Sequence, residues 1–366
     1  MEDIGIKDFL VAQNYSLGIG EFSGMVGSFA VFEFLNIKNT INVSPSLLTP
    51  RFNYFFGTTF ENDEVPVIYF INLQPGDGYS DADIWQIGTE RYKTNFGYHL
   101  LERKENMNNN LRKYATKYFE LFNYWANKGI EPPIQNLTLN ELFTENKFHF
   151  VNQHEEGKYR LFPDHSKIIY IGGIVVEEKG ILTGEKLITN NHNCVGLFSM
   201  GTLVPLAEED IPGIIVMFNK FGSLLDCYFY VKIEEYLLKN INVPENVKVV
   251  TEVEQQKLLA QASMKIFISQ CGMNSVIEAM YAGVPIICLP FHGDQNYNSM
   301  VVEHLQIGIW LNRRDLADKI GEAIDNVMND NLIYAENAKK LRENIHEKGF
   351  SLRNVFLDHV AAAIRN

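Results

Sequence analysis

The stretch from Lys265 to Asn298 constrains the fold of this chain more than any other. An apolar run of strand length, Lys265 to Ser269, ends at the turn Gln270-Cys271-Gly272. Apolar residues at helical spacing follow from Asn274 to Tyr281, and a second buried strand is expected from Ile286 to Leu289. This order of strand, turn, helix and strand predicts a parallel βαβ unit. In such a unit the carboxyl ends of the strands and the N-terminus of the helix face one crevice.

The polar residues of this stretch lie where a phosphate-bearing ligand would meet them. Gly272 permits close backbone approach, and Asn274 and Ser275 add donors at the start of the predicted helix, where the dipole favours an anion. Glu278, one turn further on, is placed to accept from a ribose diol. The pair Asp294-Gln295 follows the next strand and is placed to bind sugar hydroxyls. An ordinary βαβ unit without a ligand is the competing interpretation, because glycine turns are common.

These spacings resemble the donor-binding signature of UDP-glycosyltransferases. The residues that carry the resemblance are Gly272, Ser275, Glu278-Ala279, Gly283-Val284-Pro285, Pro290 and Gly293-Asp294-Gln295. The animal, nematode-like UDP-glucuronosyltransferase branch is the most similar. The resemblance implies an α/β fold of GT-B type, with two Rossmann-like domains facing a cleft. The C-terminal domain would hold the UDP-sugar, and the N-terminal domain a small lipophilic acceptor.

The resemblance also divides the chain into parts. Residues 1–176 are expected to be an incomplete N-terminal acceptor-binding domain, and 177–193 a charged linker. Residues 194–330 would be the UDP-sugar-binding domain and 331–366 C-terminal helices. An incomplete domain would leave a sheet edge uncovered, so we expect a homo- or hetero-oligomer with other family members.

Glu21 is the one candidate catalytic residue, since it ends a short predicted strand that begins at Tyr15. In the family, an acid at this place orients a histidine that deprotonates the acceptor hydroxyl, and the resemblance gives Glu21 that role. Four histidines lack the glycine-rich context of that base and are expected to be solvated or packing residues: His99, His149, His154 and His165. By this resemblance the base would have preceded Met1.

Further donor-site candidates come from the first half of the second domain. Ser199, Gly201 and Thr202 form a Ser-x-Gly-Thr turn after a predicted strand, which resembles the first glycine loop of the family's donor domain. Lys232 ends the next predicted strand, where the family often has a basic residue. The family's Trp-x-Pro-Gln appears as Glu252-Val253-Glu254-Gln255, so only Gln255 matches.

Two departures from the family pattern lie at the nucleotide. The tryptophan that would stack on uracil is Glu252, and an aromatic platform of this kind contributes about 1–3 kcal/mol per base. Gln270 stands where the family has a histidine that contacts the diphosphate. Because glutamine donates only a neutral hydrogen bond, we expect weaker binding of the pyrophosphate.

The acceptor side of the sequence is rich in aromatic residues at helical spacing. Candidates for an apolar acceptor pocket are Phe96, Tyr98, Tyr118, Phe119, Phe122 and Trp125. For any single one of them, plain core packing is the favoured interpretation.

Composition excludes several classes of protein. The formal net charge of −13 and the lack of a basic run argue against a nucleic-acid surface. No apolar run reaches the length of a transmembrane helix, and the acidic N-terminus does not predict a signal peptide. The resemblance nevertheless implies the endoplasmic reticulum membrane, where family members reside.

The four cysteines, Cys194, Cys227, Cys271 and Cys288, have no paired spacing. We therefore expect neither a metal site nor a disulfide framework. No cofactor is expected, since the UDP-sugar is the donor substrate.

Three interpretations of function remain open. The first is inverting transfer of glucuronic acid or glucose from UDP-glucuronic acid or UDP-glucose to a hydroxyl of a small lipophilic acceptor. The second is a catalytically inactive relative that binds nucleotide or a partner glycosyltransferase, which the departures at Glu252 and Gln270 favour. The third is a segment of a longer enzyme whose signal peptide, base and anchor lie in flanking sequence.

Overall fold

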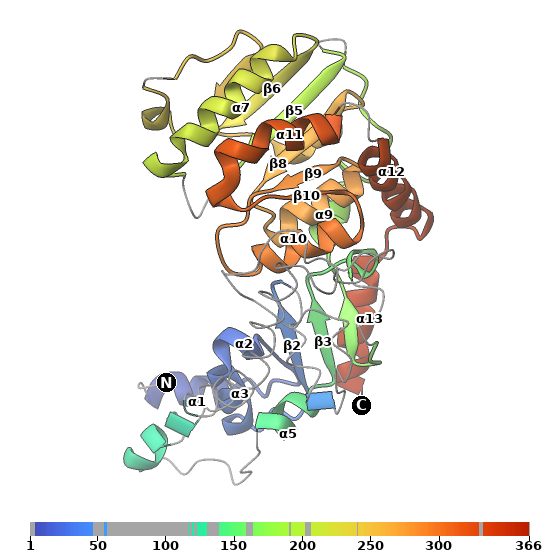
Figure 1. Cartoon of the computed structure of the whole chain (residues 1–366). Coiled ribbons are helices and arrows are strands. Elements are labelled where there is room, and N and C mark those ends of the chain that lie inside the picture. Colours follow the sequence, from blue (N-terminus) through green and yellow to red (C-terminus); the bar gives the residue numbers. More distant parts are fainter. Residues whose placement is uncertain are drawn as a thin grey trace, which may run out of the picture.

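A computed structural model describes residues 4–46, 55–56, 116, 119–120, 123–129, 139–158, 164–189, 192–201, 206–239, 241–328 and 332–365. Within these ranges the chain forms two sheets, both entirely parallel, one in each half of the sequence (Figure 1). This confirms the expected α/β class. Across the same ranges, every helix is too short or too polar to cross a bilayer.

Among the described residues, the N-terminal sheet has four strands in the order β1-β2-β3-β4. They are β1 Gly18–Gly20, β2 Thr40–Ser44, β3 Phe148–Val151 and β4 Ile168–Tyr170. Helices described in this half include α1 Ile4–Ala12, α2 Phe22–Met25, α3 Gly27–Phe34 and α5 Leu139–Thr144. Because sequential strands are neighbours and all run the same way, their carboxyl ends line one edge of the sheet.

Aromatic rings dominate the core between this sheet and its helices. Phe22 meets Phe143 edge to face at 5.0 Å between ring centroids, and Trp125 packs against Phe34 at 4.8 Å. Trp125 is buried, which confirms the core interpretation for that residue, whereas Phe119 is 41% exposed. The other aromatic candidates for an acceptor pocket, Phe96, Tyr98, Tyr118 and Phe122, lie outside the described residues.

The C-terminal sheet has six strands in the order β10-β9-β8-β5-β6-β7. They are β5 Cys194–Ser199, β6 Cys227–Lys232, β7 Val247–Val250, β8 Met264–Ser269, β9 Ile286–Cys288 and β10 Gly308–Trp310. Strands β6 and β7 are added on one side of β5. The chain then returns to the other side of β5, where β8, β9 and β10 are added in turn. This is the Rossmann strand order, and its direction reverses between β5 and β8.

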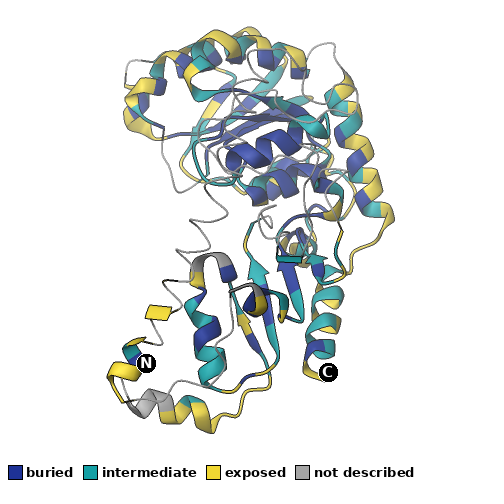
Figure 2. Ribbon diagram, turned by 60° about the horizontal axis from the view of Figure 1, so that its bottom comes forward, coloured by how far each residue is buried: buried dark blue, intermediate teal, exposed yellow. Residues whose placement is uncertain are grey.

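Helices cover both faces of the C-terminal sheet. One face packs on α7 Ile211–Ser223 and α11 Leu316–Met328, which lie side by side (Figure 1). The other face packs on α8 Gln255–Leu259, α9 Met273–Ala282, α10 Gln295–His304 and α12 Leu332–Glu347. Covering helices explain why β8 is apolar from Ile266 to Ile268 and why β9 is buried throughout. Figure 2 shows the centre of this domain in the colour of buried residues.

Two helices connect the halves. Helix α6, Ile174–Lys179, leads from the N-terminal sheet toward β5, and α13, Leu352–Arg365, returns from the C-terminal domain to pack beside β3 (Figure 1). The Glu177 carboxylate accepts from the backbone N–H of Leu352 at 2.9 Å and from the Tyr281 hydroxyl at 3.0 Å. One acid thus ties α6 to both α13 and α9.

The prediction that the cysteines form no disulfides is wrong. Cys194 bonds to Cys227, and Cys271 bonds to Cys288. Cys194 and Cys227 occupy paired positions at the amino ends of β5 and β6. Cys271 directly follows Ser269-Gln270, and Ser269 is paired with Cys288 across β8 and β9. Sequence spacing did not reveal either pair because strand neighbours are defined by sheet order.

Candidate active site

The reversal of strand order places the ends of β5 and β8 beside each other. Ser199 and Ser269, the last residues of these strands, are paired in the sheet and both are buried. In open α/β sheets the ligand crevice lies at this carboxyl edge, beside the strand reversal. Most of the predicted donor-site residues follow directly from these strand ends.

Gln270 and Gly201 lie against each other just beyond the ends of β8 and β5. Gly201 has φ +73°, and a β-carbon there would lie 2.0 Å from Nε2 of Gln270, so only glycine fits. Gln270 is buried, and its Oε1 has no hydrogen-bond partner in the described part of the chain. Lys232, the last residue of β6, donates from Nζ to the Gly201 carbonyl at 3.2 Å, so it also lies beside Gly201. Thr202 lies outside the described residues.

Helix α9 starts at the crevice, with Gly272 as its N-cap residue. Cys271 before it has φ +59°, and its backbone N–H donates to Oγ of Ser269 at 3.1 Å. Asn274 in the first turn accepts at Oδ1 from Nδ2 of Asn152, a residue of the N-terminal domain, at 3.0 Å. The first turn of this ten-residue helix has N–H groups without partners inside the helix, and the positive end of the helix dipole lies with them at this end of α9.

Two neighbouring amides hold Glu278. Gln255 donates from Nε2 to Oε2 of Glu278 at 2.6 Å and to Oγ of Ser275 at 3.2 Å. Gln256 donates from Nε2 to Oε1 of Glu278 at 2.8 Å. Gln256 was missed at the sequence level. Its signal was its position next to Gln255, since both residues open a helix that packs on α9.

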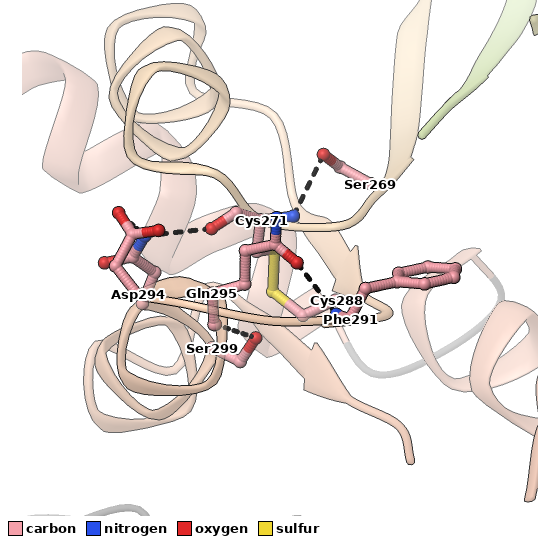
Figure 3. Close-up of a disulfide and its surroundings, with 8 residues drawn as sticks. Ser269, Cys271, Cys288, Phe291, Asp294, Gln295 and Ser299 are labelled. Carbon is pink, nitrogen blue, oxygen red and sulfur yellow. Dashed lines mark hydrogen bonds between the residues drawn. A yellow bond between two sulfur atoms is a disulfide. The ribbon is translucent and has the colours of Figure 1, made fainter. Parts of the chain in front are cut away.

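The loop after β9 carries Asp294 and Gln295 (Figure 3). Gln295 was expected at the end of a loop, but it is the buried first residue of α10. Its Oε1 accepts hydrogen bonds from the backbone N–H of Phe291 at 2.8 Å and from that of His292 at 3.1 Å. In this structure the Gln295 oxygen therefore shapes its own loop. Asp294 accepts at Oδ2 from the Ser46 hydroxyl of the N-terminal domain and from Nδ2 of Asn298.

The Cys271–Cys288 disulfide joins the two loops that carry these groups (Figure 3). One loop leads from β8 into α9, and the other leads from β9 toward Asp294. Asn298 of α10 adds a further bond between them, since its Nδ2 donates to the Cys271 carbonyl at 3.0 Å. Both cysteines are buried, so this covalent link lies in the interior of the domain.

A cavity of about 550 Å³ lies between the two domains. Glu21 from the N-terminal domain and Asn274 and Glu278 from α9 line it together. Its other lining residues are mostly apolar: Val43, Ser44, Pro45, Asn152, Ile171, Gly173, Ile174, Val175, Val176, Lys179, Gln256 and Ile277. An apolar chamber with a few convergent polar groups is the usual form of a small-molecule site.

Glu21 reaches this cavity from the N-cap position of α2, where its backbone is extended. The turn beneath it is held by Asn42, whose Oδ1 accepts from the Phe22 N–H at 2.8 Å. Asn42 Nδ2 in turn donates to Nδ1 of His149 at 3.1 Å, and burial lowers the pKa of His149 to about 3. His149 is therefore a neutral packing residue, as expected.

Two further histidines of the N-terminal half, His154 and His165, also fit the expectation of packing residues. His154 is buried, accepts at Nδ1 from the Glu156 N–H at 3.1 Å, and has its pKa lowered to about 4 by burial. His165 stacks on Phe56 at 4.0 Å between ring centroids. His99 lies outside the described residues.

Two parallel-sheet domains, a Rossmann strand reversal and an interdomain cavity lined by acidic and helix-terminal groups define a two-domain α/β protein with a cavity between its halves. The family model for UDP-glucoronosyl and UDP-glucosyl transferase matches residues 99–350. The chain therefore belongs to the UDP-glycosyltransferase family.

Individual relatives agree with this assignment. The Caenorhabditis elegans protein ugt-48, named as a UDP-glucuronosyltransferase, is 32% identical over 200 residues, 51% of this chain and 37% of that protein. The human 2-hydroxyacylsphingosine 1-beta-galactosyltransferase is 31% identical over 197 residues, 50% of this chain and 34% of that protein. The aligned part thus spans little more than a third of each of these relatives.

Solved structures confirm the GT-B fold. The calicheamicin glycosyltransferase CalG4 superposes with a TM-score of 0.60 at 15% identity, covering 98% of this chain and 76% of that one. An anthocyanidin 3-O-glucosyltransferase in complex with UDP superposes with a TM-score of 0.58 at 17% identity, covering 98% and 78%.

Proposed function

We propose that this chain binds a UDP-sugar in the crevice at the β5–β8 reversal and transfers the sugar to a hydroxyl of a small lipophilic acceptor. The observation that carries the proposal is the meeting of α9's N-terminus, Glu278 and Glu21 at one interdomain cavity. Family membership and relatives named as glucuronosyl-, glucosyl- and galactosyltransferases support the reaction class. Glucuronic acid and glucose are the sugars that we propose.

The donor's groups can be assigned to residues along the crevice. The diphosphate would meet Gly272, Asn274 and Ser275, where the helix dipole favours negative charge. Glu278 would accept from the ribose diol. Asp294 would bind sugar hydroxyls, with Gln295 holding its loop in place.

The chemistry that follows is an inverting displacement. A base takes the proton of the acceptor hydroxyl, the oxygen attacks the anomeric carbon, and the carbon–oxygen bond to UDP breaks. Glu21, at the acceptor side of the cavity, would orient that base. The N-terminus of α9 would stabilise the charge that develops on the departing diphosphate.

Gln270 and Glu252 favour a second candidate, a relative that binds nucleotide without transferring sugar. Gln270 is buried and carries no charge, at the position where the family pattern has a histidine for the diphosphate. Glu252 is exposed after β7 and offers no aromatic face to a base. Both candidates require a nucleotide site, so binding is the first test and turnover separates them.

Calorimetric titration with UDP, UDP-glucuronic acid and UDP-glucose tests the donor site. We expect micromolar binding that weakens about tenfold or more in Glu278→Ala, because a hydrogen bond to a charged acceptor is lost. Glu322→Ala, on exposed surface of α11 across the sheet, should leave affinity unchanged. If folded protein bound none of the three ligands, the proposal would be abandoned. Binding without transfer to any hydroxyl acceptor, in a panel of lipophilic alcohols and phenols, would favour the second candidate.

We also propose that the protein resides in an oxidising compartment, as expected of the endoplasmic reticulum lumen. The support is that all four cysteines of the chain pair as disulfides within the fold. Thiol counting on denatured protein from its native source checks this, and four free thiols would contradict it.

A further inference from the structure

Gln256 is a buried polar residue of the interdomain cavity, and its side chain contacts Glu278. Its side chain is only 5% exposed, it lines the interdomain cavity, and its Nε2 donates to Oε1 of Glu278 at 2.8 Å. Its own Oε1 is buried and has no hydrogen-bond partner among the described residues. A buried acceptor left unpaired costs about 1–3 kcal/mol.

That cost argues against a purely structural role for Gln256. Leu259 and Ala260 of the same short helix segment are buried in the apolar cluster under α9, and an apolar side chain at position 256 would pack there without an unpaired oxygen. What an apolar residue could not do is donate to Glu278. The amide is therefore best explained by the carboxylate that it contacts.

The two glutamines donate hydrogen bonds to different oxygens of the Glu278 carboxylate. Gln255 takes Oε2 and Gln256 takes Oε1, and neither amide donates to both oxygens. An ionised carboxylate has about four acceptor positions, two on each oxygen. One position on each oxygen is thus used, and one on each remains for a ligand in the cavity that Glu278 lines.

Two acceptor positions on adjacent oxygens match a vicinal diol, whose hydroxyls both donate. With either amide removed, the carboxylate would be free to rotate about its terminal torsion, which is broad. The pair of acceptors would then lose its fixed direction.

We propose that Gln256 is a positioning residue that, with Gln255, orients Glu278 for the two ribose hydroxyls and so makes nucleotide recognition specific for an intact ribose diol. The inference rests on the proposed UDP-sugar site and names a determinant of its specificity that lies outside the family-like signature.

The test compares UDP with 2′,3′-dideoxy-UDP by calorimetry on the full chain. Gln256→Met keeps the length of the side chain and removes the donor. We expect its affinity for UDP to fall about ten- to a hundredfold, the range for a hydrogen bond to a charged group, while its affinity for 2′,3′-dideoxy-UDP stays the same. In a background of Glu278→Gln, the same change should cost nothing further, because both residues act through one contact.

Gln256→Glu provides a second variant of almost the same shape. At neutral pH its carboxylate would repel Glu278, whereas acid would place a proton between the two groups and restore a donor. We expect its UDP affinity to rise as the pH falls, relative to wild type. Gln261→Met, whose side chain contacts Thr189 at 3.5 Å outside the cavity, serves as the matched control and should leave both affinities unchanged.

The inference would be overturned if Gln256→Met lost equal affinity for both nucleotides, or lost affinity for neither. It would also be overturned if wild-type protein bound UDP and 2′,3′-dideoxy-UDP with equal affinity. In each of these cases UDP still binds and the donor-site proposal stands. If wild-type protein bound neither nucleotide, the donor-site proposal would fail first and the role of Gln256 with it.

Discussion

Burial of a titratable side chain changes its pKa, and with it the pH dependence of stability. His149 is the clearest case, because it is completely buried, accepts from Asn42 and lies 4.2 Å from the Phe143 ring between centroids. Burial, with smaller contributions from Lys167 and His165, lowers its pKa from 6.5 to about 3. The folded protein thus keeps this ring neutral at pH values where an unfolded chain would charge it.

His149 should make stability depend on pH. Between about pH 3 and 6.5 the unfolded state binds a proton at this residue and the native state does not, so stability is full above 6.5 and is lost as pH falls. The free energy of unfolding should fall by up to about 1.4 kcal/mol per pH unit from this residue alone. In His149→Gln, urea unfolding between pH 4 and 6 should show a slope smaller by about that amount. Phe143→Leu, a packing change beside it, should lower stability without changing the slope. An unchanged slope in His149→Gln would contradict this prediction.

Gly173 allows a close contact between the two domains, because it has no β-carbon facing Tyr281. It has φ +114°, lines the interdomain cavity, and a β-carbon there would lie 2.3 Å from the Tyr281 hydroxyl. We expect Gly173→Ala to destabilise the protein by more than about 2 kcal/mol, because backbone strain adds to a clash with a buried ring. Gly180→Ala, at φ +66° in open space, is the control for strain alone and should cost about 1 kcal/mol. Equal free energies of unfolding for the two variants, measured in urea, would show that the contact with Tyr281 does not matter.

At the scale of elements, hydrophobic periodicity predicted much of the C-terminal domain. The expected strand from Lys265 to Ser269 is β8, and the expected helix ending at Tyr281 is α9. The prediction succeeded because strands covered on both faces are continuous apolar runs bounded by glycine turns. The disulfides and the role of Gln256 could not be predicted, because both depend on which elements lie side by side and on register, which periodicity does not encode.

Comparing the two disulfides tests whether a covalent link between the loops after β8 and β9 is needed for UDP affinity. Cys271–Cys288 joins these loops, whereas Cys194–Cys227 joins the amino ends of β5 and β6 at the opposite edge. Replacing either pair with alanine should cost about 3 kcal/mol of stability, by release of a closed loop in the unfolded chain. Only the Cys271→Ala/Cys288→Ala variant should also lose UDP affinity, by about tenfold, because its loops carry Gly272 and Asp294. Calorimetry below the unfolding transition of both variants checks this, and equal affinities would show that the loops hold their shape without the link.

For the whole molecule, α13 is the element that returns from the donor domain to the N-terminal sheet. Phe356 of α13 packs on Phe150 of β3 at 4.7 Å between ring centroids, in a cluster that includes Ile41 and Ala363. Leu357, its neighbour in sequence, is 48% exposed. The helix therefore presents an apolar face to the N-terminal sheet, and its first N–H is fixed by Glu177 at the junction.

A charge on the packed face of α13 should uncouple the two domains. We expect Phe356→Asp to lower the stability of the N-terminal domain by about 2–4 kcal/mol and to split thermal unfolding into two transitions, because an unpaired charge replaces a half-buried ring that packs on the buried Phe150. The radius of gyration from small-angle X-ray scattering should rise as the domains move apart. Leu357→Asp places the same charge one residue further along on the exposed side and should change stability by no more than about 0.5 kcal/mol. If both variants unfolded in one transition at the same temperature, α13 would not be the coupling element, and the hydrogen bonds across the cleft from Ser46 and Asn152 would be the next candidates.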